Sequence, residues 1–297
     1  MDFQFLQNPI SKKWVILSPR RAKRPDIAKG FEPVCPFCPG KELEEKEVYR
    51  VGGAEGDSNW QIRVLPNKFP FAPIHELIIH SPDHHKNFDE LPLSSTELII
   101  NTYRQRYNAL KDKGQVYIFH NHGEGGGESL PHPHTQLAVI PFDVKMDVPR
   151  LASNKEIAEV SKDQITQETK EFVIFCPKTS QWPDEVWVSP KKRGRVFGEI
   201  DDAEVSDLAF TLSRLVQILD LRHGNEFPFN FYIYQGGDWY LRIIPRVKSL
   251  GGFEIGTGIF INTQDPNETI KFIKEHFENP DEEKIKQKHQ AEYGRGV

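Results

Sequence analysis

The sequence has little cysteine, only three residues in 297, and no apolar run long enough to span a bilayer. So few cysteines, and an odd number of them, exclude a disulfide-stapled scaffold. A transmembrane helix needs about 20 apolar residues, and the N-terminus lacks the basic-then-apolar order of a signal peptide. We therefore expect a cytoplasmic protein with no membrane partner.

A strong excess of charge of one sign is also missing, because the formal net charge is only −5. Without an overall basic balance, no nucleic-acid partner is expected. Charged residues make up 27% of the chain and hydrophobic residues 37%, which is a globular rather than a disordered composition. At this length, two domains or one large domain are expected.

Two stretches of the sequence follow one plan of strand, loop, helix, strand, turn and strand. Each helix begins with a capping signal, Ser94 with Glu97 and Asp201 with Glu204, and continues with apolar residues at helical spacing. Each copy ends in a short strand that closes with Ile-Pro, TQLAVIP in the first and YLRIIP in the second. The pattern predicts an α+β fold of two duplicated halves, each an antiparallel sheet with a packed helix.

The His-x-His pair that follows the turn is present only in the first copy. The first copy carries HPHTQ, whereas the corresponding stretch of the second contains Asp238-Trp239-Tyr240. We therefore expect one site per chain, in residues 1–148. Residues 149–297 then form a degenerate half that serves as a scaffold, a substrate wall or a dimer surface.

A metal site is indicated by Cys35 and Cys38, whose CxxC spacing suits two zinc ligands. A tetrahedral site needs two more ligands, and the histidines of SPDHHK, HNH and HPH are all candidates. A closed site of four protein ligands leaves no position for water, so its role would be mainly structural. The alternative is two reduced thiols in a turn. Cys176, in FVIFCP, is interpreted as a core thiol.

A nucleophile is indicated by HPHTQ, which follows the glycine-rich run HGEGGGES. On an extended strand, His132 and His134 would point to one side, together with Gln136. A glycine-rich turn exposes backbone N–H groups that hold phosphate oxygens, and a neutral imidazole beside phosphate is a good nucleophile. The alternative is that the two histidines only bind metal or pack at the surface.

Further phosphate and nucleoside contacts are suggested near the N-terminus. The segment SPRRAKRP carries four cations, Arg20, Arg21, Lys23 and Arg24, which form either a solvated patch or a binding site for a sugar phosphate. Asn67 and Phe69 in VLPNKFPF suit hydrogen bonding to, and stacking on, a base or ribose.

These motifs resemble those of the galactose-1-phosphate uridylyltransferase family of the histidine-triad superfamily over nearly the whole chain. The resemblance implies two histidine-triad-like halves and a covalent nucleotidyl-histidine on His134, with Gln136 binding the transferred phosphoryl group. A nucleotide-sugar such as UDP-glucose would donate the nucleotide, and a hexose-1-phosphate would accept it. The segments that carry the resemblance are NPISKKWVILSPRRAKRP, CPFC, LPNKFP, SPDHHK, NHGEGGGESLPHPHTQ and KSLGGFEIG.

The resemblance also implies a Zn²⁺ ion, a homodimer and specific substrate contacts. The implied zinc ligands are Cys35, Cys38, His84 and His132. Asn121 and Ser129 would support the loop and phosphates, Arg21 and Arg24 would hold the sugar phosphate, Asn67 would contact the nucleoside, and Lys248 and Glu254 would contact the hexose.

The identity of the substrate is the point at which the sequence departs from the galactose transferases. Phe260 stands where those enzymes carry glutamine, and GGFEIGTGIFIN is closer to the ADP-glucose phosphorylase branch. The second prediction is therefore an adenylyltransferase that uses ADP-glucose and inorganic phosphate. A histidine-triad hydrolase and a zinc-stabilised nucleotide-binding module are further alternatives.

Overall fold

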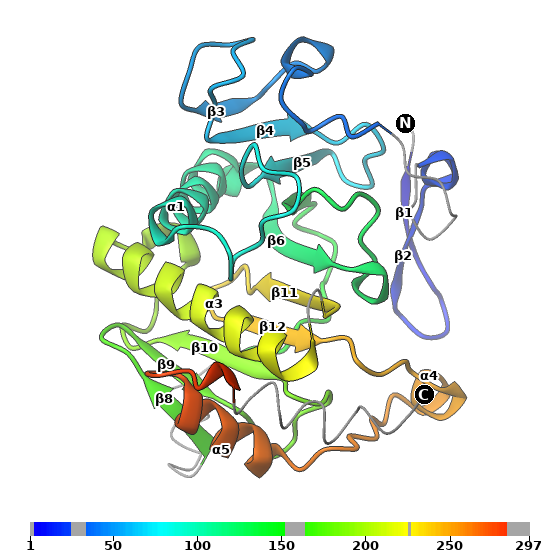
Figure 1. The fold of residues 1–297 in the computed structure, drawn as a ribbon. Helices are drawn as coiled ribbons and strands as arrows, with labels where there is room; N and C mark the ends of the chain where they lie inside the picture. Colours follow the sequence, from blue (N-terminus) through cyan, green and yellow to red (C-terminus); the bar gives the residue numbers. More distant parts are fainter. Residues whose placement is uncertain (1–2, 25–33, 152–163, 225–226, 284–297) are drawn as a thin grey trace.

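Ten antiparallel strands form one continuous sheet in the computed structural model, which describes residues 3–24, 34–151, 164–224 and 227–283. The order across the sheet is β3-β4-β5-β7-β6-β11-β12-β10-β9-β8 (Figure 1). The strands are β3 (Tyr49–Val51), β4 (Ile62–Pro66), β5 (Ile74–Ile79), β6 (Gln115–His122), β7 (His134–Ile140), β8 (Ile165–Glu168), β9 (Phe172–Phe175), β10 (Val186–Pro190), β11 (Phe229–Ile233) and β12 (Leu241–Pro245).

The two halves of the sheet have the same strand order when each is read inward from its own edge. The β3 edge leads through β5 and β7 to β6, and the β8 edge leads through β10 and β12 to β11. The halves join where β6 pairs with β11, for example at His120 and Phe231. The predicted α+β class and antiparallel pairing are confirmed. The division into domains 1–148 and 149–297 stays a prediction.

Two long helices, α1 (Leu93–Leu110) and α3 (Asp202–His223), lie side by side on one face of the sheet (Figure 1). Their apolar faces join the inward side chains of both halves in one hydrophobic core. Because side chains alternate along a strand, the odd-numbered residues of β7, such as Leu137 and Val139, face this core. The even-numbered residues His134 and Gln136 face the opposite side.

The helix starts test the predicted capping signals. Asp201 caps α3, since its side chain accepts from the Glu204 backbone N–H, and Glu204 closes a capping box. The prediction for Ser94 is wrong, because α1 begins at Leu93 after Pro92 and has no side-chain cap. The cap position is Pro92, two residues before Ser94, so the serine lies inside the first turn of the helix.

The remaining elements lie at the margins of the sheet. A two-stranded hairpin, β1 (Gln4–Gln7) and β2 (Trp14–Leu17), precedes it, and α5 (Pro266–His276) packs against β8 and α3. The short helix α4 (Gly252–Thr257) projects to one side (Figure 1). Short 3-10 turns are η1 (Pro19–Lys23), η3 (Glu42–Glu44), η4 (Lys111–Lys113), η5 (Glu124–Gly126) and η7 (Phe197–Glu199). Among the described residues, none of the helices has the length and apolar character to cross a bilayer.

Candidate functional site

Four side chains from three segments of the chain converge just before β7. Their ligand atoms all lie within 4.8 Å of one another, in Cys35, Cys38, His84 and His132. The Sγ of Cys38 is 3.1 Å from Nδ1 of His84 and 3.6 Å from Nδ1 of His132. The Sγ of Cys35 is also 3.6 Å from the latter nitrogen. The four ligands implied by the resemblance therefore form a cluster that can hold a metal ion.

The protonation of this cluster fits a metal site. A backbone carbonyl oxygen only accepts, so Nε2 of His132, 2.8 Å from the Ser81 oxygen, carries the proton and Nδ1 presents its lone pair to the sulfurs. Burial lowers the pKa of His132 to about 4, which keeps the imidazole neutral. Burial, with Cys38 alongside, raises the pKa of the Cys35 thiol to about 11, so a thiolate here requires a cation.

His134 is the first residue of β7, and the preceding backbone fixes its tautomer. Its Nδ1 lies 2.9 Å from the His132 carbonyl oxygen, so Nδ1 carries the proton and Nε2 keeps a lone pair. Burial lowers the pKa of His134, and this hydrogen bond offsets only part of the shift. The imidazole is therefore neutral near pH 7, as a nucleophile at phosphorus must be.

The two histidines of HPH do not share one strand face as expected. His132 precedes β7 and turns toward the cysteines, whereas His134 lies on the strand and faces a cavity. Phe37, inside the CPFC motif, separates their surroundings by packing edge-on to both rings, with centroids 6.0 Å from His132 and 5.4 Å from His134. Proline at position 133 interrupts the strand pattern, because it has no N–H for the ladder.

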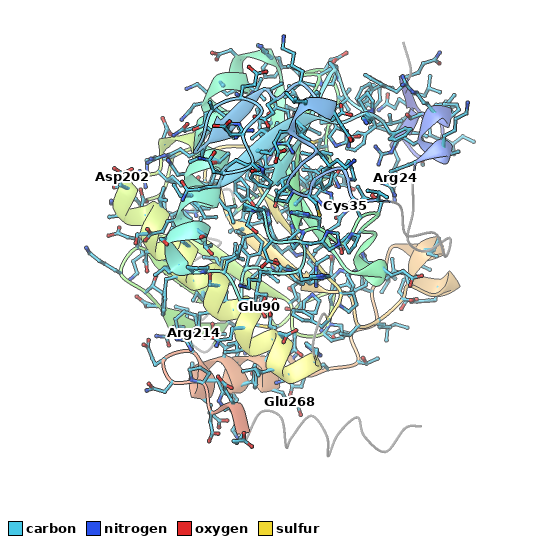
Figure 2. The ribbon with its side chains drawn as sticks, turned by 45° about the horizontal axis from the view of Figure 1, so that its top comes forward. Arg24, Cys35, Glu90, Asp202, Arg214 and Glu268 are labelled. Carbon is cyan, nitrogen blue, oxygen red and sulfur yellow. The ribbon has the colours of Figure 1, made fainter. Side chains whose placement is uncertain are left out.

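The cavity beside His134 has a volume of about 410 Å³, within the range of small-molecule sites. It lies on the face of the sheet away from α1 and α3. Figure 2 shows Arg24 and Cys35 on the same side of the molecule, and α5, which carries Glu268, at another end. Of the residues predicted from sequence, the cavity brings together Arg24, Asn67, Ser129, His134 and Gln136.

His75 contacts two of these residues and was not identified from the sequence. Its Nε2 is 3.0 Å from Oε1 of Gln136 and 3.3 Å from Nδ2 of Asn67. In the tautomer that carries the proton on Nε2, His75 donates to the Gln136 oxygen at the shorter distance and leaves the Gln136 amide N–H₂ to face a ligand. The sequence signal that could have identified His75 is its position as the second residue of the strand IHELII, which closely follows LPNKFP along the chain.

Other predicted site residues lie outside the cavity wall. Arg21 donates from Nη1 to the Phe69 carbonyl oxygen at 2.5 Å, and thus supports the segment that carries Asn67. Asn121 accepts from Nδ2 of Asn230 at 2.9 Å. Lys248 and Glu254 form an ion pair of 3.2 Å with each other at α4. Neither of these last two residues lies in the wall of the cavity beside His134.

The glycine-rich run is a closed turn and does not form the expected cradle of free N–H groups. The N–H groups of Gly126, Gly127 and Glu128 donate to the carbonyl oxygens of Gly123 and Glu124. A Cβ on Gly126 would lie 2.9 Å from the Phe229 oxygen, so glycine permits close packing on β11. The run thus braces the two halves, and only Ser129 and Leu130 beyond it reach the cavity.

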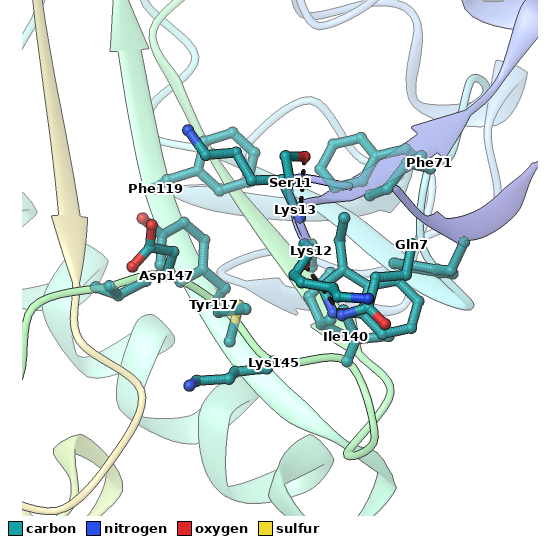
Figure 3. A pocket seen from close by; sticks show the side chains of 17 residues that line it. Gln7, Ser11, Lys12, Lys13, Phe71, Tyr117, Phe119, Ile140, Lys145 and Asp147 are labelled. Atoms are coloured by element: carbon teal, nitrogen blue, oxygen red, sulfur yellow. Dashed lines mark hydrogen bonds between the residues drawn. The ribbon is translucent and has the colours of Figure 1, made fainter. Parts of the chain in front are cut away.

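A larger cavity, of about 910 Å³, lies farther along the same face of β6 and β7 (Figure 3). The β1–β2 hairpin forms one wall, and Phe71, Tyr117 and Phe119 form another. Phe71, in the wall of this larger cavity, packs against His75 with ring centroids 4.3 Å apart and the ring planes tilted by 57°. The chemistry-bearing residues of HPHTQ are absent from this larger space.

Comparison with known proteins shows similarity to galactose-1-phosphate uridylyltransferases and to an ADP-glucose phosphorylase. Residues 74–139 match the family model described as galactose-1-phosphate uridyl transferase, N-terminal domain. An ADP-glucose phosphorylase of Arabidopsis thaliana is 28% identical over 91% of this chain and 92% of its own length. A galactose-1-phosphate uridylyltransferase of Thermotoga maritima is 26% identical over 90% of this chain and 96% of its own.

Solved structures agree with the fold. The Arabidopsis ADP-glucose phosphorylase with bound ADP-glucose superposes with a TM-score of 0.71 at 28% identity, covering 92% of this chain and 99% of that one. A uridylyltransferase structure gives a TM-score of 0.73 at 21% identity over 91% and 97% of the two chains. The fold is therefore that of the uridylyltransferase-like enzymes. In sequence and in fold, the chain is thus similar to the galactose-1-phosphate uridylyltransferases and to the Arabidopsis ADP-glucose phosphorylase.

Proposed function

We propose that this protein is a nucleotidyltransferase that moves a nucleoside monophosphate from a nucleotide-sugar to a hexose-1-phosphate, as a UDP-glucose–hexose-1-phosphate uridylyltransferase does. The observation that carries the proposal is a neutral His134 whose Nε2 lone pair serves a cavity that also holds Gln136 and Arg24. The named relatives and the family match support the same activity.

In the proposed first step, Nε2 of His134 attacks the phosphorus of the nucleoside phosphate. A N–P bond forms, the bond from that phosphorus to the bridging oxygen breaks, and the hexose-1-phosphate leaves with the electron pair. The imidazole ring becomes cationic, and the His132 carbonyl oxygen that accepts from Nδ1–H stabilises this charge. An oxygen of the acceptor's phosphate group then attacks the phosphorus, the N–P bond breaks, and the neutral imidazole of His134 is restored. Two successive transfers of this kind predict ping-pong kinetics.

The surrounding residues take the remaining roles in the proposal. Gln136 donates from its amide to a phosphoryl oxygen and is held for this by His75. Arg24 supplies positive charge at the cavity, Ser129 a hydroxyl, and Asn67 a contact to the nucleoside. Arg21 and Asn121 support the segments that carry these groups.

We also propose that Cys35, Cys38, His84 and His132 bind Zn²⁺. Two thiolates and two imidazoles are a preferred zinc set, and the sulfur–nitrogen distances of 3.1 and 3.6 Å are close to the roughly 3.3–3.8 Å edges of a zinc tetrahedron. The ion would tie the CPFC segment to the sheet. A reducing compartment such as the cytoplasm keeps both thiols available.

The second candidate is an ADP-glucose phosphorylase-like activity, in which inorganic phosphate accepts an adenylyl group. The observation that favours it is the 28% identity to the Arabidopsis ADP-glucose phosphorylase over 91% of the chain. The nucleophile and the intermediate would be the same, with phosphate in place of a sugar phosphate. Only the base and the acceptor distinguish the two candidates.

Intact-protein mass spectrometry under acid-free conditions separates the candidates. The protein is mixed with UDP-glucose or with ADP-glucose, and each adduct is then challenged with a hexose-1-phosphate or with inorganic phosphate. We expect a uridylyl-sized mass gain that a hexose-1-phosphate removes. An adenylyl-sized gain that phosphate removes would establish the second candidate, and loss of the nucleotide to water alone would indicate a hydrolase. No gain with either donor would contradict both transferases.

We propose, finally, that two chains form a homodimer in which the α4 region contacts the partner. Phe253, Ile255, Ile259 and Ile261 around α4 are all at least half exposed, an apolar surface that a monomer rarely leaves open. The nearby pair Lys248 and Glu254 does not reach its own catalytic cavity. In a dimer, these two residues can contact the hexose bound to the partner.

Light scattering after gel filtration tests the dimer. The wild-type chain should elute with twice the mass of one chain, and the double variant Phe253→Asp, Ile255→Asp should elute as a monomer, because two charges cannot be buried in an apolar interface. Leu93→Asp, an exposed apolar position at the start of α1, is the control and should remain dimeric. A monomeric wild type, or a dimeric double variant, would refute the proposed interface.

A further inference from the structure

A cluster of four buried polar side chains lies directly behind the catalytic strand, on its core side. Thr135 follows His134 on β7 and points toward α1, while His134 points into the cavity. Tyr103 from α1, His80 after β5, and His120 on β6 surround the threonine. All four side chains are at most 1% exposed.

The four side chains make one connected hydrogen-bond network centred on Oγ1 of Thr135. The hydroxyl of Tyr103 is 2.6 Å from Oγ1, Nε2 of His80 is 2.8 Å away, and Nδ1 of His120 is 3.2 Å away. A hydroxyl group donates once and accepts twice. Oγ1 is therefore saturated when it donates to His80 and accepts from Tyr103 and His120.

The same network reaches the backbone of the nucleophile. Nδ1 of His120 lies 3.1 Å from the carbonyl oxygen of His134, and the backbone N–H of His80 donates to the Pro133 carbonyl oxygen at 3.2 Å. The residues on both sides of the His134 side chain are thus held from the core. Helix α1, strand β6 and the residue that follows β5 contribute to this attachment.

Packing alone does not require polar side chains at these four core positions. Two buried imidazoles and two buried hydroxyls are costly to desolvate, and the ring nitrogens Nδ1 of His80 and Nε2 of His120 have no hydrogen-bond partner among the described residues. Apolar side chains of similar size would fill the space at a lower desolvation cost. What hydrogen bonds add over apolar packing is a fixed direction and register.

We propose that Tyr103, Thr135, His80 and His120 are positioning residues that fix the catalytic strand so that the His134 imidazole meets the phosphorus in line. This inference rests on the proposed nucleophilic role of His134. The network touches neither the cavity nor the metal ligands' side chains, so it acts through the backbone of residues 133–135. Catalytic groups must hold their geometry within about 0.5 Å, and a misplacement of about 1 Å can lower a rate by about 100-fold.

The test compares Thr135→Val, which replaces the hydroxyl with a methyl group, with Thr135→Ser, which keeps it. In Thr135→Val we expect adduct formation at saturating donor to slow about 100-fold with the KM for donor changed less than threefold. Thr135→Ser should recover most of the rate. Tyr103→Phe, which removes one hydrogen-bonding partner and preserves the ring, should slow the same step about tenfold.

Thr166→Val is the matched control, because Thr166 is equally buried on β8 and its hydroxyl donates to the Ile174 oxygen, at the far edge of the sheet. Its adduct rate should equal that of the wild type. Rates are compared at least 10 °C below each melting temperature. If Thr135→Val and Tyr103→Phe both keep the wild-type rate, or if Thr135→Ser is as slow as Thr135→Val, the positioning role is wrong.

A second measurement separates this inference from the proposed function. Carbethoxylation of His134 by diethyl pyrocarbonate, followed by peptide mass spectrometry, reports the accessibility of its Nε2 whether or not any donor reacts. We expect the rate to change at least threefold in Thr135→Val and to stay constant in Thr166→Val. If the wild type forms no adduct but Thr135→Val still changes the carbethoxylation rate, the proposed function is contradicted and the positioning role is kept. Equal carbethoxylation rates in the wild type and Thr135→Val would overturn the positioning role.

Discussion

Replacing His134 with alanine should abolish nucleotidyl transfer and leave the binding of the nucleotide-sugar largely intact. The imidazole is the only group in our scheme that bonds to phosphorus, and loss of a covalent nucleophile commonly costs at least about 10⁴-fold in rate. The donor contacts from Arg24, Asn67 and Ser129 remain in the cavity. Transfer assays, intact-protein mass spectrometry and donor titration by calorimetry measure the three quantities.

His276→Ala is the control for this prediction, because His276 is a buried histidine of α5, outside the cavity. It should form the adduct at the wild-type rate at temperatures where it is folded. A mass gain that persists in His134→Ala would place the nucleophile elsewhere, and His75, 3.0 Å from Gln136, would be the first residue to examine. Loss of donor binding together with loss of transfer would instead make His134 a binding residue.

The metal cluster is the part of the site that sequence predicted best, and the reason is local. A CxxC spacing places two sulfurs on one turn, and the backbone carbonyl of Ser81 sets the tautomer that lets His132 complete the set. The resemblance selected His84 over His85, and the fold brings His84 to the sulfur of Cys38. Residue type and spacing therefore indicate the two cysteines directly, whereas the choice among the histidines came from the resemblance.

The environment of the cavity was harder to predict because it depends on pairing between strands. Leu77 of β5 lies opposite Gln136 of β7, and this register places Leu65, Leu77 and Gln136 on one face. The order of residues along the chain does not show that His75 will contact Gln136 of a neighbouring strand. The same limit explains why the prediction of a phosphate cradle in the glycine-rich run is wrong. Its N–H groups donate to carbonyl oxygens of the same turn, which packs on β11.

The repeated pattern did not show how the two halves join. The repeat predicted two sheets, but an unpaired edge at β6 would expose its backbone groups, and pairing with β11 satisfies them. In the second half, Arg242 and Glu185 form a buried ion pair of 2.8 Å, and Nη1 of Arg242 also donates to the Tyr232 hydroxyl at 3.1 Å.

Replacing Cys38 with serine should remove the metal and lower the melting temperature by about 10 °C. Cys38 contacts both histidine ligands, so no three-ligand remnant keeps the same geometry. A ligand present at about 1,000 times its Kd stabilises the folded state by about 4 kcal/mol, and each kcal/mol shifts the melting of a chain of this size by about 2–4 °C. Metal content by elemental analysis and thermal unfolding by calorimetry measure the effect, and a strong chelator added to the wild type should reproduce it.

Chemistry should survive this loss better than stability does, which separates a structural ion from a catalytic one. The backbone, and not the His132 side chain, fixes the tautomer of His134, and strand pairing between His134 and Ile79 holds that backbone in place. At least 10 °C below its melting temperature, Cys38→Ser should therefore form the adduct within about tenfold of the wild-type rate. Cys176→Ala, which removes a buried thiol outside the cluster, should keep the metal. An intact fold with a rate lowered 1,000-fold or more would show that the ion takes part in the chemistry and that our structural assignment is wrong.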